Sequence, residues 1–155
     1  MTTPAAGPLP VRGSLEFLQC LWRTSHALEQ RSRRMERTMG VTAPQRLVLR
    51  LLGRFPGITA GQLARSLHVD PGTLSASLRR LEARRLIERR RDPADSRRVT
   101  IGLTHQGRAM DVPRVGTIEA AADALLASAS PADLAATVRV LNRFSEILSG
   151  DDFRG

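Results

Sequence analysis

The sequence is poor in the residues on which disulfide chemistry and membrane insertion depend. It has one cysteine among 155 residues, which excludes an internal disulfide. Its apolar runs all fall well short of the roughly 20 residues that a membrane-spanning helix needs. The N-terminus lacks the charged and apolar regions of a secretory signal. A reducing, cytoplasmic setting without a membrane partner is therefore expected.

Catalytic and metal-binding patterns are also missing. The sequence contains no nucleophile–base motif, no phosphate-binding glycine loop and no paired catalytic carboxylates. The three histidines, His26, His68 and His105, lie far apart, and none has a second good ligand four residues away. A chain of this length forms about one domain, which leaves no room for a separate catalytic domain. We expect no enzyme activity, no metal site and no cofactor.

Lysine is absent, and arginine supplies all of the positive side chains. The 24 arginines outnumber 15 acidic residues and give a net charge of +9. Arginine usage also follows the base composition of a genome, so clustering is better evidence than the total. Residues 79–98 contain nine arginines and four acidic residues, a local charge of +5. This cluster favours a polyanionic partner.

The apolar pattern predicts a mainly helical chain. One long helix is expected over about 13–39, where Leu18, Leu21, Leu28, Met35 and Met39 recur at helical spacing. Capping boxes at 42–45 and 59–62 start a second and a third helix. Asp70 followed by Pro71 starts a fourth, which ends near Arg84. The short gap between the third and fourth helices predicts a helix-turn-helix.

The segment that follows predicts a β-hairpin. Residues 87–91 and 98–103 are β-compatible, and Pro93 and Asp95 mark the turn between them. A hairpin directly after an arginine-rich helix is typical of a winged helix-turn-helix. In that fold the helix reads the major groove of DNA and the hairpin reaches a neighbouring minor groove.

Two further helices are expected after the hairpin. Thr104 caps the first, which Pro113 should bend or interrupt between about 109 and 116. Ser130 caps the last, whose apolar positions have the spacing of a helix-packing seam: Leu134, Val138, Leu141, Phe144 and Leu148.

The hairpin turn resembles the wing signature of the MarR family of bacterial transcriptional regulators. The pattern consists of Asp95 and Arg97, followed by Leu103 and Thr104. Similar segments occur at 41–45, 63–67, 70–75, 81–87 and 103–107, and the resemblance covers about 15–148. It implies a mainly α fold with a small β-wing, in a single domain over 13–149. The winged helix-turn-helix would span about 41–104, with dimerisation helices at about 13–39 and 105–149, a mobile arm at 1–12 and a tail at 150–155.

The fourth helix and the wing supply the candidate DNA contacts. The helix face opposite Leu74 and Leu78 is small and polar, and Arg79 is long enough to reach a guanine. The resemblance implies that Asp95 orients Arg97 for the minor groove. The other wing arginines would neutralise phosphates. The DNA-binding candidates are Thr73, Ser75, Ala76, Ser77, Arg79, Arg80, Arg89, Arg90, Arg91, Asp95, Arg97 and Arg98. For the fourth helix, the alternative is an ordinary amphipathic surface helix. For Asp95 and Arg97, it is a surface ion pair that contributes under about 1 kcal/mol to stability.

Family members often hold an effector in a crevice between the dimer helices and the winged domain. The matching residues here would include Trp22, His26, Arg46, Arg50 and Met110. Trp22 offers a stacking face and Arg46 a carboxylate partner, so a small aromatic acid is a sensible ligand. The alternative is that Trp22 fills the core and Arg46 is solvated.

These patterns predict a homodimeric repressor that binds a pseudo-palindromic operator in double-stranded DNA and is released by an effector. One alternative is a winged-helix protein-interaction module that does not bind DNA. Another is a thiol-based redox sensor acting through Cys20. A thiol-sensing branch of the family holds its thiolate with tyrosine hydroxyls, whereas this chain has no tyrosine. Cys20 is therefore expected to be a small packed hydrophobe.

Overall fold

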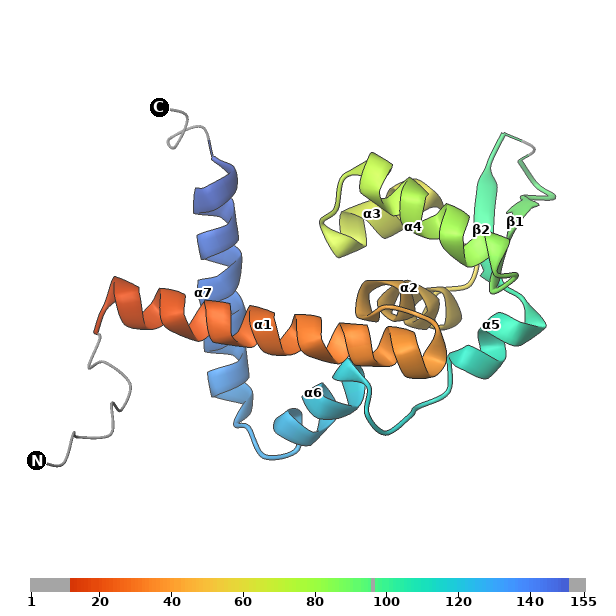
Figure 1. Ribbon diagram of the computed structural model, residues 1–155. Coiled ribbons are helices and arrows are strands. Elements are labelled where there is room, and N and C mark those ends of the chain that lie inside the picture. Colours follow the sequence, from red (N-terminus) through yellow and green to blue (C-terminus); the bar gives the residue numbers. More distant parts are fainter. Residues whose placement is uncertain (1–11, 96, 151–155) are drawn as a thin grey trace, which may run out of the picture. The chain divides into compact units, whose positions relative to one another are not determined.

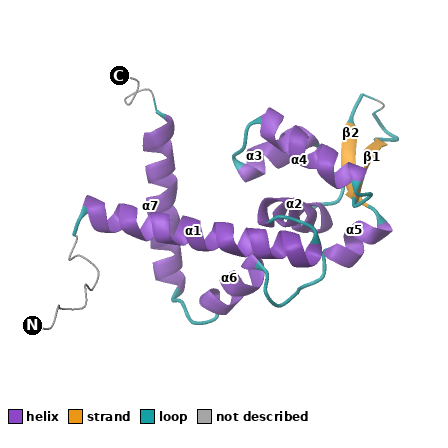
Figure 2. Cartoon of the chain, viewed as in Figure 1, coloured by secondary structure: helices purple, strands orange, loops and turns teal. Residues whose placement is uncertain are grey.

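The computed structural model describes residues 12–95 and 97–150. The expected N-terminal arm and C-terminal tail therefore lie almost wholly outside the described residues. The elements are α1 (Ser14–Met39), α2 (Ala43–Arg54), α3 (Ala60–Leu67), α4 (Pro71–Ala83), β1 (Ile87–Arg91), β2 (Val99–Leu103), α5 (His105–Met110), α6 (Ile118–Leu126) and α7 (Pro131–Ser149) (Figure 1). Figure 2 shows the helices in purple and the antiparallel pair β1–β2 in orange. The mainly α fold with a small β-wing is confirmed.

The chain divides into two compact units, with the boundary between Arg114 and Val115. The first, which we call the winged unit, contains α1 to α5, and the second contains α6 and α7. The sequence had grouped the segment of α5 with the C-terminal helices. The structure places α5 with the winged unit because Gly107 packs directly against the backbone carbonyl of Leu86, where a larger residue would not fit.

The predicted helix starts are confirmed by their hydrogen bonds. The Thr42 hydroxyl accepts from the Gln45 N–H at 3.4 Å, and the Gln45 side chain accepts from the Thr42 N–H at 3.0 Å. Thr59 and Gln62 form the same pair of bonds at 3.2 and 2.9 Å. These bonds satisfy backbone donors that a helix N-terminus leaves without partners.

The helix-turn-helix closes through an unusual backbone conformation at His68. This residue ends α3 with a φ of 51°, in the left-handed region. The Val69 N–H still reaches back to the Ala64 carbonyl at 3.2 Å, and Asp70 then caps α4. Only His68, Val69 and the capping Asp70 thus connect α3 to α4, as the sequence predicts.

The core of the winged unit joins α2, α3, α4 and the hairpin. Leu49 of α2, Leu63 of α3, Leu78 of α4 and Ile101 of β2 are each at most 1% exposed. Burial of such side chains contributes about 1.5–3 kcal/mol each. The core is contiguous: Val41, Val48, Leu49, Leu52, Leu63, Ala64, Leu74, Leu78, Leu81, Leu86, Ile87, Ile101 and Leu103. The orientation of α4 and the hairpin is therefore fixed by packing.

The hairpin is held on both edges of β2. On one edge β1 pairs from Ile87 opposite Leu103 to Arg91 opposite Val99. On the other, the Ile101 N–H donates to the Ile58 carbonyl at 3.0 Å, next to an isolated bridge between Thr59 and Thr100. The sequence did not predict the bond to Ile58, which joins the wing to the segment that caps α3.

The predicted interruption after α5 is confirmed. Helix α5 ends at Met110 and α6 begins at Ile118, with Pro113 in the connection. Thr117 caps α6 and Ser130 caps α7, each by accepting a backbone N–H three residues ahead.

Neither α6 nor α7 contains a buried residue. Their exposed apolar side chains are Leu125, Leu126, Leu134, Val138, Val140, Leu141, Ile147 and Leu148.

Candidate nucleic-acid interface

Helix α4 presents a small polar surface on the face opposite its buried stripe. Leu74, Leu78 and Leu81 are at most 3% exposed and anchor the helix. Among the candidate contacts on this helix, Ala76 and Ser77 are half-buried, and the others are exposed: Thr73, Ser75, Arg79 and Arg80. This face offers short side chains beside long cationic ones, an arrangement that lets a helix approach base edges closely.

The N-terminus of α4 is organised by Asp70. One carboxylate oxygen accepts the Thr73 backbone N–H at 2.8 Å, and the other accepts the Thr73 hydroxyl. The Thr73 side-chain hydrogen bond, helped by the backbone bond, holds the pKa of Asp70 below its ordinary value of 3.8. Thr73 therefore approaches any ligand with its hydroxyl proton already engaged.

Two aspartates shape the tip of the wing. Asp92 accepts the Ala94 N–H at 2.9 Å and lies 3.6 Å from the guanidinium of Arg98. Asp95 accepts the Arg97 N–H at 3.0 Å. The expectation that Asp95 orients Arg97 thus takes a specific form, because the contact is made to the backbone of Arg97 rather than to its guanidinium.

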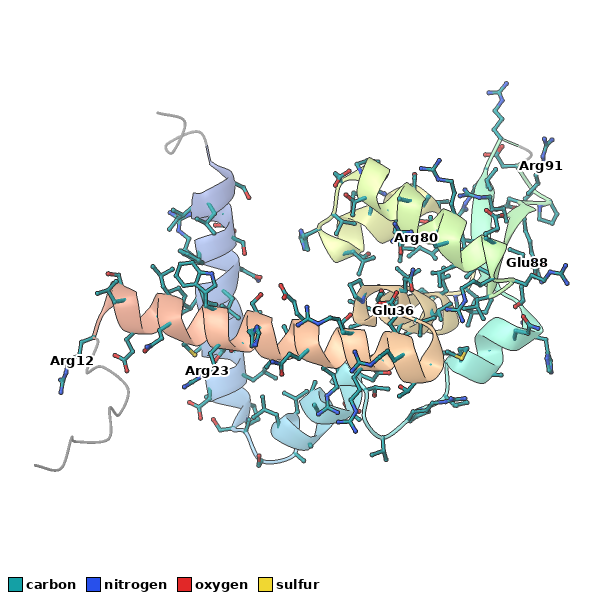
Figure 3. All side chains as sticks on the ribbon, in the orientation of Figure 1. Arg12, Arg23, Glu36, Arg80, Glu88 and Arg91 are labelled. Atoms are coloured by element: carbon teal, nitrogen blue, oxygen red, sulfur yellow. The ribbon has the colours of Figure 1, made fainter. Side chains whose placement is uncertain are left out.

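The arginines of α4 and the wing fall into two groups, with and without an ion pair, that the sequence could not separate. Arg89 pairs with Glu82 of α4 at 3.3 Å, and Arg90 pairs with Glu88 on its own strand. In the part of the chain that the structure describes, no ion pair involves Arg79, Arg80, Arg91 or Arg97. Figure 3 shows Arg80 on α4 and Arg91 beside the outer end of the wing. These four side chains form what we call the free arginine set.

An arginine outside the candidate set lies beside the root of the wing. Arg65 of α3 is exposed and lines a groove with Phe55 and Arg98, whose guanidinium donates to the Gly57 carbonyl at 3.3 Å. The position of Arg65 on the polar side of α3 was the available signal. Arg65 lies close to Arg98 because β2 is bonded to Ile58, a contact that no local sequence pattern revealed.

The proposed effector residues have different environments. Trp22 is 69% exposed, so it does not fill the core of its unit, and the imidazole of exposed His26 is 2.7 Å from the Gln30 side chain. Arg46 is 0% exposed and donates to the Met110 and Val112 carbonyls. Both parts of the alternative, a core Trp22 and a solvated Arg46, are therefore wrong, and the Arg46 guanidinium does not face an open crevice either. Arg50 pairs with Asp111, and Met110 is half-buried.

Cys20 is exposed, which corrects the expectation of a packed thiol. It lies on a part of α1 in which no residue before Met35 is buried. Within the described segments, no three His, Cys, Asp or Glu side chains come together as a metal site would require. The helices formed by those segments are too short or too polar to span a bilayer.

Comparison with known proteins gives one consistent answer. Residues 39–98 match the model of the MarR family. The chain is 34% identical over 103 residues to the organic hydroperoxide resistance transcriptional regulator of Bacillus subtilis (strain 168), covering 63% of this chain and 69% of that protein. Residues 39–98 contain the helix-turn-helix, β1 and the turn of the wing.

Solved structures share the same fold. The MepR–DNA complex of S. aureus superposes with a TM-score of 0.69 at 24% identity, covering 88% of this chain and 99% of that one. Bordetella bronchiseptica BpsR, whose structure concerns regulation of its DNA binding by 6-hydroxynicotinic acid, gives 0.67 at 26% identity, with coverage of 88% and 98%. The chain therefore belongs to the MarR family and is a winged helix-turn-helix transcriptional regulator.

Proposed function

We propose that the protein is a homodimeric repressor that binds a pseudo-palindromic operator in double-stranded DNA and is released by a small-molecule effector in the cytoplasm. No catalytic role is part of this proposal. The observation that carries it is the free arginine set, which α4 and the wing present beside the short polar side chains of α4.

The two parts of this surface suit different tasks. Arg79 lies on the exposed face of α4, beside small side chains. A guanidinium there can donate two hydrogen bonds to the edge of a guanine. Arg97 lies at the wing tip, where a narrow minor groove concentrates negative potential. Arg91 and Arg80 suit phosphate contacts, which set affinity without selecting sequence.

Dimerisation is supported by apolar surface within each unit. In the winged unit, α1 exposes Leu15 by 62%, Trp22 by 69% and Leu28 by 46%. In the second unit, Leu134, Val138, Leu141 and Leu148 recur along α7 at three-four spacing and are all at least 38% exposed. Apolar stripes of this extent favour a partner, and a second copy supplies the two-fold symmetry that a pseudo-palindrome requires.

A small aromatic acid remains the proposed effector class. The regulation of BpsR by 6-hydroxynicotinic acid supports that class. Trp22 and His26 are accessible on α1 and are one helical turn apart. The carboxylate partner would have to be a residue other than Arg46, since that guanidinium is buried and bonded to two carbonyls.

The proposal is tested by capturing genomic DNA fragments on the purified protein and sequencing them. We expect an enriched motif with two inverted half-sites about one helical turn apart. Affinity for it should fall steeply with salt, by about 10³-fold or more between 50 and 200 mM for six or more phosphate contacts. A folded dimer that enriches no motif would instead support the protein-interaction alternative.

The redox alternative is separated by a second measurement. The similarity to a hydroperoxide resistance regulator and the exposure of Cys20 make it worth testing. We expect organic hydroperoxide to release wild-type protein and Cys20→Ser from the captured motif to the same small extent. Release of the wild type alone would move the sensing role to Cys20.

A further inference from the structure

Four consecutive carbonyls at the end of α5 all accept hydrogen bonds from arginine side chains. Arg114 donates to Ala109 at 3.3 Å. Arg46 donates to Met110 at 2.6 Å and to Val112 at 2.8 Å. Arg50 donates to the Asp111 carbonyl and, at 2.8 Å, to the Asp111 carboxylate. We call this arrangement the guanidinium cap.

The local sequence explains why arginine side chains, rather than backbone N–H groups, bond to these carbonyls. Pro113 has no N–H, so it cannot donate to the Ala109 carbonyl four residues earlier, and the Arg114 guanidinium donates there instead. The end of a helix also carries partial negative charge, which cations stabilise. Arg46 and Arg50 are one turn apart on α2 and so reach neighbouring carbonyls together.

One member of the cap is buried, and the others are partly or fully exposed. Arg46 is 0% exposed, and a buried charge without hydrogen-bonding partners is strongly unfavourable. Gly53, one turn beyond Leu49 on α2, lies so close to the Asp111 carboxylate that any Cβ there would overlap it. A larger residue at position 53 would have to displace the Asp111 carboxylate from this position.

The cap lies at the end of the winged unit. It holds residues 109–112, immediately before the boundary between the two units at Arg114 and Val115. Beyond it, Val115 is fully exposed. The cap therefore holds the last residues of the winged unit before the chain continues to α6 and α7.

We propose that Arg46 and Arg50 are positioning residues for operator recognition, because the guanidinium cap sets the half-site spacing that the dimer accepts. The inference rests on the proposed function. A dimer reads two half-sites only when its two recognition helices match one helical turn of DNA. One inserted base pair moves the second half-site by about 3.4 Å and about 35°, so a stiff chain exit should reject it and a loosened exit should tolerate it.

The test compares binding to the captured operator, to the same operator with one inserted base pair, and to a single half-site. We expect wild-type protein to lose about tenfold or more on insertion, the scale of one mismatched base pair. Arg50→Gln should lose about threefold or less, while its affinity for the single half-site stays within about twofold of wild type. Arg54→Gln, an exposed arginine one turn further along α2, is the matched control and should behave as wild type.

The outcomes separate the inference from the function on which it rests. If wild-type protein binds no operator, the proposed function fails. If wild type binds and Arg50→Gln discriminates against the insertion as strongly as wild type, the cap is structural only and the inference is overturned. If Arg50→Gln does not fold, Asp111→Asn carries the same comparison, because it removes the ion pair but leaves the backbone carbonyl to Arg50. Faster tryptic cleavage after Arg114 in these variants should show that the cap has opened.

Discussion

The two units of this protein differ in how much of their apolar surface they bury themselves. The winged unit has a contiguous core drawn from α2, α3, α4 and the hairpin. In the second unit, α6 and α7 together contain no buried residue, although both carry apolar side chains at helical spacing. The winged unit is thus stabilised by its own packing, whereas the stripes of α6 and α7 need another surface to cover them.

The largest effect should come from the core of the winged unit. Leu78 is 0% exposed, so Leu78→Ala removes buried methyl groups and leaves a cavity in the middle of α4. We expect the free energy of unfolding, measured by urea denaturation, to fall by about 2–5 kcal/mol. Leu47→Ala on α2, where Leu47 is 50% exposed, should change it by about 0.5 kcal/mol or less. Equal losses in the two variants would contradict the core assignment.

A substitution in the apolar stripe of α7 should weaken dimerisation without unfolding the chain. Leu141→Asp places a carboxylate in the apolar stripe of α7 and should raise the dimer dissociation constant by about 100-fold or more. Sedimentation at micromolar concentration should then show monomers whose helical content is close to that of wild type. Asn142→Asp adds the same charge beside the stripe and should leave the dimer intact. A dimeric Leu141→Asp would place the interface elsewhere.

The smallest effect concerns the cap of α4 at low pH. Because the folded-state pKa of Asp70 lies below 3.8, its charged form stabilises the folded state. That contribution is fully present above the ordinary pKa and is lost as pH falls through the depressed one. Asp70→Asn keeps a capping acceptor but does not titrate. The stability of wild type relative to this variant should be constant from about pH 6 to pH 5 and should decline below about pH 4.

Local rules predicted most of the fold from the sequence. Capping residues such as Thr42, Thr59 and Asp70 act within three positions of themselves, so their helix starts could be read directly. The hairpin and the break at Pro113 were predictable for the same reason. The bond from Ile101 to Ile58 was not, because it joins segments far apart in the chain.

The arginines show where sequence reasoning failed. Arg46 and Arg91 carry the same charge, and no local pattern distinguishes them. Arg46 is buried because α2 packs against the end of α5, which only the tertiary fold brings there. The ion pair between Arg89 and Glu82 likewise depends on the packing of β1 against α4. Position, not residue type, divides these arginines into structural and candidate binding groups.

The central claim is that α4 selects the sequence while the wing supplies affinity, and paired binding titrations test it most directly. Arg79→Ala and Arg97→Ala are titrated against operator and scrambled DNA at two salt concentrations, with both variants first shown to be folded dimers. Arg79→Ala should lose roughly 1–3 kcal/mol chiefly on the operator, and Arg97→Ala should weaken binding to both DNAs. Equal losses on both DNAs for Arg79→Ala, or no loss for Arg97→Ala, would contradict the account.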